Sequence, residues 1–275
     1  MKKKIIISVL WIIAIVTLAF GVVKGVVPAV REQIEVRQAK KQADELEKKV
    51  RYRGSAGESE GTAAVDPDFD LPDGYFGVDH NAMKAVEPQY CGWLFQNGTI
   101  SLPVVYSPDD DSYWLKHDIY GNRTDVGTPF CYGKIDFEKP TQNITVYGHH
   151  FNGNDWLMFG PLMGYKNADY LKEHPTFIFD TPFGVYEYRV FSVFNCLASD
   201  SAKYGRSAFS SEEEFYRFAE DMKGRSLYDT GVIVKGNDSI LTLSTCDRSY
   251  DWENGRLVVM MVRAGEDLTE SVYGK

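Results

Sequence analysis

The stretch that decides the fold of this chain is Thr242-Leu243-Ser244-Thr245-Cys246, with Arg256 ten residues after the cysteine. Residues 240–244 form a short apolar run typical of a buried strand, and residues 257–262 form a second one. A cysteine at the end of one strand and an arginine at the start of the next are able to face each other across a groove. A fixed positive charge favours the thiolate, which is the attacking form of cysteine. The alternative is a buried structural thiol, which is the commoner role of cysteine.

Length and charge narrow the class of protein. The 275 residues are enough for one domain of roughly 200 residues plus extensions. Residues 1–53 carry 12 Lys/Arg and 5 Asp/Glu, a net charge of +7. The remaining residues carry 18 Lys/Arg and 34 Asp/Glu, a net charge of −16. An acidic body argues against nucleic acid as a partner, because phosphate contacts need clustered positive charge.

The N-terminus has the pattern of a membrane anchor. Met1-Lys2-Lys3-Lys4 is a basic cap, and residues 5–23 are an uncharged apolar run. That run is about as long as a helix that crosses the hydrocarbon core. We therefore predict a single-pass protein of the cell membrane, with residues 1–29 as cytoplasmic cap and anchor and the remaining body extracellular. The alternative is a cleaved signal peptide, for which residues 27–29 form a poor cleavage site.

Two connecting segments follow the predicted anchor. Residues 30–53 have apolar side chains at helical spacing and Glu45/Lys49 as a favourable i,i+4 pair. Residues 54–74 are rich in Gly, Ser and acidic residues, which is typical of a flexible linker. The expected division of the chain is therefore an anchor at 1–29, a stalk helix and linker at 30–74, and a catalytic body at 75–275.

The body has the pattern of a mainly β domain. We expect its strands at 93–95, 99–106, 130–134, 143–147, 176–180, 185–197, 232–234, 240–244 and 257–262. Its clearest helix begins with the capping box Ser211-Glu212-Glu213-Glu214 and ends at Gly224. Many short strands with turn signals and one inserted helix favour a closed or nearly closed β-barrel.

Gly148-His149-His150 follows the strand expected at 143–147. Loops at strand ends concentrate functional side chains, and histidine is the side chain suited to carry a proton for a cysteine nucleophile. A zinc site is the alternative, but the chain has no CxxC or HExxH spacing. Asp109-Asp110-Asp111 is a candidate calcium site, although adjacent carboxylates usually lie in a solvated turn. We expect neither a metal nor a cofactor.

Together these motifs resemble the sortase family, and class B sortases most closely. The resemblance covers roughly residues 80 to 265. It includes the Leu-Ser-Thr-Cys motif with its arginine, the upstream Gly-His, the stretch at 115–122 and the helix at 211–223. It implies a closed eight-stranded sortase-type β-barrel with N-terminal helices and a helix before the penultimate strand.

The resemblance also implies a membrane-anchored cysteine transpeptidase without a cofactor. Cys246 would attack a C-terminal sorting motif of a secreted protein and form a thioacyl-enzyme, which an amine of a peptidoglycan precursor or a pilin resolves. His149 would act as general acid and then base, and Arg256 would hold the substrate carbonyl and the oxyanion. His150 is then interpreted as loop structure. The positions that match the substrate groove of class B enzymes are Leu115, Tyr147 and Ser244.

Several alternatives stay open at this point. A cysteine peptidase would resolve the same acyl-enzyme with water, and a surface binding module would keep the fold without the chemistry. Asp247 directly follows the cysteine, where a negative charge tends to raise a thiol pKa unless it points to solvent or pairs with Arg248. We expect Cys246 as a free thiol and the other three cysteines as buried thiols. A Cys91/Cys131 bridge is the alternative.

Overall fold

The computed structural model describes residues 27–51, 75, 77–139, 141–151, 154–265 and 267–274, together with scattered positions between 11 and 24. The described chain divides into two compact units, Met1–Gln42 and Ala43–Lys275. The linker predicted at 54–74 lies outside the described residues, and the anchor predicted over 1–29 lies mostly outside them.

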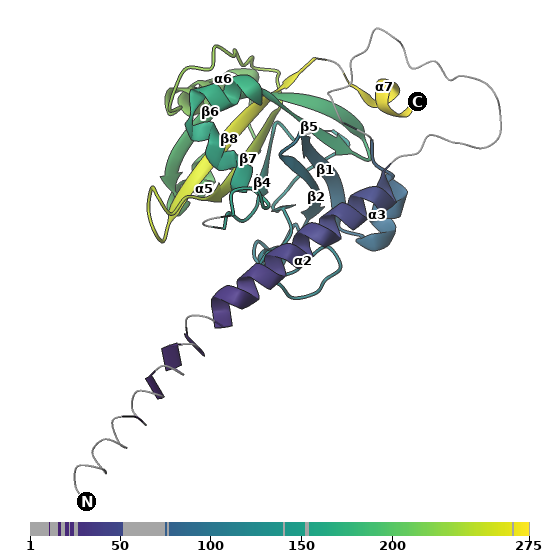
Figure 1. Cartoon of the computed structure of the whole chain (residues 1–275). Helices are drawn as coiled ribbons and strands as arrows, with labels where there is room; N and C mark the ends of the chain where they lie inside the picture. The colour runs from purple at the N-terminus through teal and green to yellow at the C-terminus, as the bar shows by residue number, and fades with distance from the viewer. Residues whose placement is uncertain are drawn as a thin grey trace, which may run out of the picture. The chain divides into compact units, whose positions relative to one another are not determined.

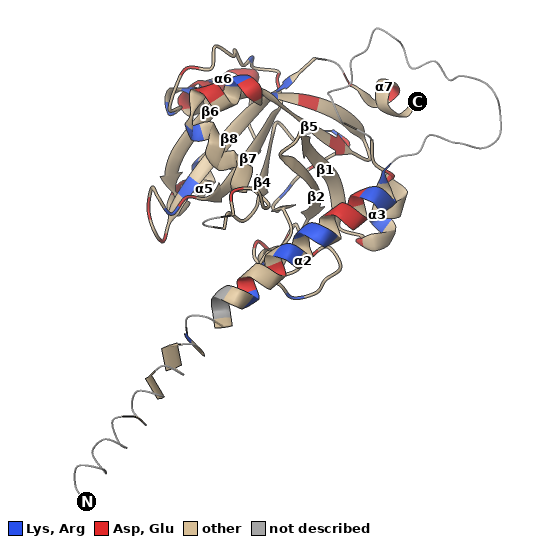
Figure 2. Ribbon diagram, viewed as in Figure 1, with Lys and Arg blue, Asp and Glu red and all other residues tan. Residues whose placement is uncertain are grey.

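The membrane prediction needs correction. Among the described residues, the structure contains no helix that combines the length and the apolar character needed to cross a bilayer. The long helix α2 (Val27–Val50) carries acidic and basic side chains along its length (Figure 2), including an Arg31–Glu35 pair at 2.9 Å. The localisation predicted from the sequence, a single-pass membrane protein, is therefore contradicted.

Eight strands close into a barrel in the order β1-β2-β3-β4-β7-β8-β6-β5, with β5 returning to β1 (Figure 1). The closed eight-stranded fold predicted from the sequence is confirmed. In chain order the strands are β1 (Tyr90–Gln96), β2 (Ile100–Tyr106), β3 (Phe130–Cys131), β4 (Asn143–Tyr147), β5 (Thr176–Thr181), β6 (Gly184–Leu197), β7 (Ile240–Cys246) and β8 (Gly255–Ala264).

Two pairings in the barrel are parallel, β2 with β3 and β4 with β7, and the others are antiparallel. Parallel neighbours end at the same edge of a sheet. The last pair of β4 and β7 is Tyr147 with Ser244. The segments that follow these two strands therefore leave the barrel side by side.

The shorter helices lie in the connections between strands, except α3, which precedes β1, and α7, which follows β8. They are α3 (His80–Val86), η2 (Tyr113–Leu115), η3 (Gly160–Lys166), α4 (Ala168–Glu173), η4 (Ala198–Asp200), α5 (Ser201–Tyr204), α6 (Glu212–Gly224) and α7 (Thr269–Tyr273). The predicted capping of α6 is present, because the Ser211 side chain accepts a hydrogen bond from the Glu214 N–H. The apolar stripe of α6 is buried with Phe194 of β6 and Met260 of β8, so this helix covers the outer face of that sheet.

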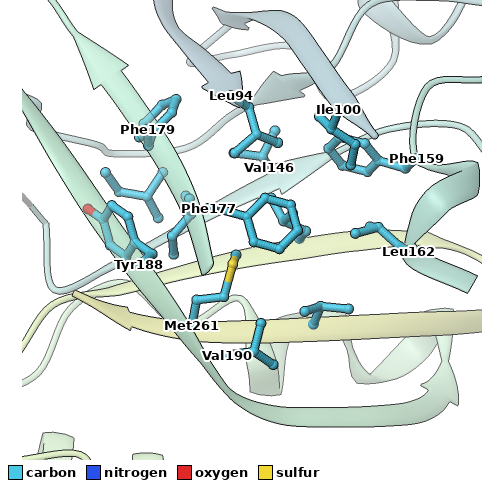
Figure 3. Packing of buried hydrophobic residues seen from close by; sticks show 14 of the residues in the cluster. Leu94, Ile100, Val146, Phe159, Leu162, Phe177, Phe179, Tyr188, Val190 and Met261 are labelled. Atoms are coloured by element: carbon cyan, nitrogen blue, oxygen red, sulfur yellow. The ribbon is translucent and has the colours of Figure 1, made fainter. Parts of the chain in front are cut away.

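The barrel interior is filled by side chains from all eight strands. Leu94, Val146, Phe177 and Met261 are among those that meet there (Figure 3). These four side chains are at most 1% exposed. Burying a side chain of this size contributes about 1.5–3 kcal/mol. The interior is therefore a packed core, and the functional groups lie at its edge.

One expected strand is not a strand. Residues 232–234 form an extended loop with Ile233 largely exposed. Side chains bind its backbone in place of a neighbouring strand, since Lys223 donates to the Val232 carbonyl and the Thr230 hydroxyl accepts from the Val232 N–H. The strand expected at 130–134 also shortens to Phe130–Cys131, because Gly133 adopts a φ of 87° that breaks extended structure.

Candidate active site

Cys246 and Arg256 are direct cross-strand partners in the hairpin formed by β7 and β8. Both side chains are partly exposed. Gly255 lets the two strands approach, because a Cβ at this position would lie 2.1 Å from the carbonyl oxygen of Asp247. One guanidinium nitrogen of Arg256, Nη1, donates to the Gly255 carbonyl at 2.9 Å. The hairpin therefore places a thiol and a fixed positive charge at one end of the barrel.

The backbone after β4 brings His149 level with Cys246. The Gly148 N–H donates to the Ser244 carbonyl at 3.2 Å, and the Thr245 hydroxyl donates to the Gly148 carbonyl at 2.8 Å. Gly148 is required here, because a Cβ would lie 2.8 Å from the buried ring of Phe159. Tyr147 pairs with Ser244 at the end of the parallel ladder, and His149 and Cys246 each follow two residues later in the chain.

The His149 ring is oriented by a backbone carbonyl from another part of the chain. Its Nε2 lies 2.9 Å from the carbonyl oxygen of Leu115, at the end of η2. A carbonyl only accepts, so Nε2 carries the proton and Nδ1 of the neutral ring holds a lone pair. Burial lowers the pKa of His149, and Lys116 and Arg248 act in the same direction, against the Leu115 carbonyl and Asp125. The ring is thus set up as a neutral base near pH 7.

His150 contacts the backbone of the cysteine itself. Its Nδ1 lies 3.1 Å from the Cys246 carbonyl oxygen, and its Nε2 lies 2.9 Å from Oδ1 of Asp155. The ring is almost fully buried. Our interpretation of the sequence treated His150 only as loop structure, because the parallel register that brings it to Cys246 has no local sequence signal.

Asp247 neither points to solvent nor pairs with Arg248. Its buried carboxylate forms an ion pair with Lys166 of η3, accepts from the Asn195 amide of β6 at 2.6 Å and accepts from the Ser249 hydroxyl at 2.7 Å. Burial alone would raise the pKa of Asp247, but these hydrogen bonds and the Lys166 charge outweigh it and lower that pKa. Arg248 instead lies over the Trp252 ring, 5.6 Å from its centre. The negative charge next to the thiol is therefore balanced locally.

The three predicted groove residues differ in their surroundings. Ser244 is buried, and its hydroxyl lies 2.9 Å from the Tyr204 hydroxyl. Tyr147 is partly buried beside the Tyr132 ring at 5.2 Å, and burial raises the pKa of Tyr147. Leu115 is partly exposed, and its carbonyl holds His149. Leu115 and Tyr147 therefore adjoin the candidate site, whereas the Ser244 hydroxyl is engaged inside the protein.

All four cysteines are free thiols, and three of them are buried. The Cys91 and Cys131 sulfurs lie 3.8 Å apart without a bond. Burial raises the pKa of Cys91, and it raises the pKa of Cys196 to about 11. Cys246 is the partly exposed thiol. Within the described part of the chain, no group of three or more His, Cys, Asp or Glu has the arrangement of a metal site.

The barrel and the thiol, arginine and imidazole at its edge are features of a cysteine transpeptidase, and comparison with known proteins agrees. A family model described as the sortase domain matches residues 119–264. The chain therefore belongs to the sortase family. It is similar to Sortase B of Listeria monocytogenes, with 34% identity over 178 residues that cover 64% of this chain and 70% of the relative. It is also similar to Sortase B of Staphylococcus aureus, with 27% identity over 180 residues that cover 65% of this chain and 72% of the relative. These relatives place it in class B.

Solved structures show the same likeness. A Staphylococcus aureus sortase B–substrate complex superposes with a TM-score of 0.62 and 26% identity, covering 68% of this chain and 84% of that one. The structure of Clostridium perfringens sortase B superposes with a TM-score of 0.62 and 27% identity, covering 68% of this chain and all of that one, 100%.

Proposed function

We propose that this sortase cleaves a C-terminal sorting motif of secreted proteins and transfers the acyl group to an amine, with Cys246, His149 and Arg256 as its catalytic residues. The observation that carries the proposal is the pairing of Cys246 with Arg256 across the hairpin, with His149 at the end of the strand parallel to β7. The likeness to a sortase B solved as a substrate complex supports the substrate class.

In the first step the Cys246 sulfur attacks the carbonyl carbon of the scissile amide. The carbonyl oxygen becomes an oxyanion, which collapses to the thioester as the carbon–nitrogen bond breaks. The leaving nitrogen takes a proton and departs as an amine. We assign that proton to His149, which receives it when the thiol ionises and which is held beside Cys246 by the Gly148 backbone contacts.

In the second step an incoming amine attacks the thioester carbonyl. His149, now neutral, accepts a proton from the amine, and Cys246 leaves as the thiolate. The lowered pKa of His149 favours the neutral ring that this step requires. The acceptor that we propose is an amine of a peptidoglycan precursor or of a pilin.

Arg256 is assigned to the substrate carbonyl in both steps. A guanidinium has five N–H donors in a fixed plane, and the bond from Nη1 to the Gly255 carbonyl orients that plane. Donors aimed at a developing oxyanion typically supply about 10²–10³ in rate each. This assignment is supported by the position of Arg256 as the cross-strand partner of Cys246.

The test measures transfer of the acyl group from a peptide to an amine. The full chain is incubated with a sorting-motif peptide, with and without triglycine as amine acceptor, and the products are separated by mass. Acceptor-dependent conjugate supports transfer, whereas hydrolysis without conjugate would identify a cysteine peptidase. Cys246→Ala should abolish both products, and turnover retained by that variant would show that the nucleophile is another residue.

A further inference from the structure

A side chain completes the ladder of hydrogen bonds that leads to Cys246. In a parallel pair of strands, alternate residues of one strand donate their N–H groups to carbonyls of the other. The Gly148 N–H donates to the Ser244 carbonyl at 3.2 Å, so a ladder continued by one step would bring the N–H of residue 150 to the Cys246 carbonyl. In the structure, Nδ1 of the His150 ring lies 3.1 Å from that carbonyl.

The other edge of the same ring binds the loop that follows β4. His150 Nε2 lies 2.9 Å from Oδ1 of Asp155. The loop closes on itself where the Phe159 N–H donates to the His149 carbonyl at 3.0 Å. The His150 ring therefore connects the end of β7, which carries the thiol, to the loop that begins with His149.

Both partners of the ring accept hydrogen bonds. A backbone carbonyl and a carboxylate have no proton to donate, and a neutral imidazole has one N–H, whereas an imidazolium has two. The His150 side chain is only 6% exposed, so water does not readily replace a missing partner. Each ring nitrogen therefore faces one of the two acceptors, and the ring bridges them.

We propose that His150 is a positioning residue for the transpeptidase reaction. Its ring holds the carbonyl of Cys246, fixes the backbone from which the thiol projects and joins it to the loop of His149. This inference rests on the proposal that Cys246 is the nucleophile. The two adjacent histidines thus have separate roles: His149 moves protons, and His150 holds the nucleophile in place.

The experiment measures the reactivity of Cys246 without a sorting substrate. The full chain and its variants are alkylated with iodoacetamide, and the rate at Cys246 is followed by mass spectrometry of the peptide that contains it. His150→Ala removes both bonds and should slow alkylation by about tenfold or more, because small misplacements of a reacting atom cost up to about a hundredfold. His150→Asn keeps an N–H donor near the position of Nδ1, so it should restore the rate to within about threefold.

Asp155→Ala removes the acceptor of His150 Nε2 and should slow alkylation of Cys246 in the same direction as His150→Ala. His174→Asn and Asp169→Asn are the matched controls, since neither residue contacts Cys246 or His150 in the described structure. They should leave the alkylation rate unchanged.

Two results would overturn the inference. One is a wild-type alkylation rate in His150→Ala, or a rate in His150→Asn no higher than in His150→Ala. The other is a wild-type alkylation rate in Asp155→Ala. If His150→Ala does not fold by circular dichroism, the rate in Asp155→Ala decides, because the Asp155 side chain is 70% exposed and its loss does not threaten the core. Turnover by Cys246→Ala would instead refute the proposed nucleophile, so the two failures are distinguishable.

Discussion

At the scale of single residues, the site depends on charges placed around one thiol. Arg256 provides a fixed positive charge across the hairpin, and Lys166 neutralises the carboxylate of Asp247 directly after the cysteine. His149 stays neutral because burial lowers its pKa. Each of these side chains therefore affects the charge around the thiol in a different way, and single substitutions should distinguish their effects.

The oxyanion role of Arg256 is tested by Arg256→Lys. A lysine keeps the charge but lacks the planar set of donors that fits a carbonyl oxygen. We expect kcat/KM for the sorting-motif peptide to fall by about 10²–10³-fold, with the barrel still folded by circular dichroism. Arg217→Lys on the exposed face of α6 is the matched control and should leave the rate unchanged. Equal activity of the Arg256 variant and wild type would remove Arg256 from the oxyanion site.

The carboxylate of Asp247 should make stability depend on pH in the acid range. Its folded-state pKa is lower than the ordinary value of 3.8, so the folded state binds the proton less well than the unfolded state. The stabilisation is therefore present above pH about 4 and is lost as pH falls through the folded pKa. Asp247→Asn should lower the free energy of unfolding near pH 7 by about 2–4 kcal/mol.

The measurement is urea unfolding of wild type and Asp247→Asn between pH 3 and pH 7. The difference in the free energy of unfolding between wild type and Asp247→Asn should become smaller toward pH 3, because wild type loses the same interaction there. Asp169→Asn is the control, since its ion pair with Lys172 is exposed and contributes little. If wild type and Asp247→Asn differed by the same free energy of unfolding at every pH, the charge of Asp247 would not be what stabilises the hairpin.

At the scale of elements, the end of α2 belongs with the barrel. Leu46 and Val50 are 2% and 0% exposed and pack in one cluster with Trp93 and Phe95 of β1. Glu47 of the same helix accepts a hydrogen bond from the Ser101 hydroxyl of β2 at 2.8 Å. The catalytic body that the sequence predicts to begin at residue 75 therefore has packing partners before that position.

This packing predicts the outcome of truncation. A chain that begins at residue 75 loses Leu46 and Val50, each of which contributes about 1.5–3 kcal/mol by burial. We expect it to unfold at a lower urea concentration than a chain that begins at residue 43. Leu46→Ala in the longer chain should reproduce part of the loss, whereas Lys48→Ala on the exposed side should not. Equal urea midpoints of unfolding for the two chain lengths would show that α2 does not contribute to the stability of the barrel.

At the scale of the whole molecule, closure of the barrel separates one thiol from the other three. Cys91, Cys131 and Cys196 are at most 6% exposed, whereas Cys246 ends β7 at the barrel edge. Buried thiols react slowly because the sulfur is inaccessible, and for Cys91 and Cys196 burial also raises the pKa, which makes the thiolate scarce. The fold itself therefore makes the chemistry selective.

Counting reactive thiols tests that selectivity. In native buffer we expect a thiol reagent such as dithiobisnitrobenzoate to label one cysteine quickly, and in concentrated urea all four. Cys246→Ala should remove the fast phase and leave the slow one. A fast phase that persists in this variant would mean that the barrel opens often enough to expose an interior cysteine.

The sequence by itself determined the parts of this protein that depend on local spacing. Cys246 and Arg256 face each other because β7 and β8 are consecutive antiparallel strands, and α6 begins after Ser211 because its cap lies within one turn. The Gly148-His149 pair was also recognisable as a strand end. The expected strand at 232–234 failed, because its apolar pattern reflects Val234 packed beneath α6 rather than a sheet neighbour.

Only the tertiary structure decided which distant groups complete the site. His150 reaches Cys246, and Asn195 and Lys166 reach Asp247, across 50 or more residues of chain in each case. These contacts depend on the parallel register of β4 with β7 and on where η3 and β6 pack. Parallel strands are joined by long connections that do not fix their register, so no local pattern specifies it. The residues proposed for the chemistry therefore have sequence signals, and the residues that contact them from distant parts of the chain do not.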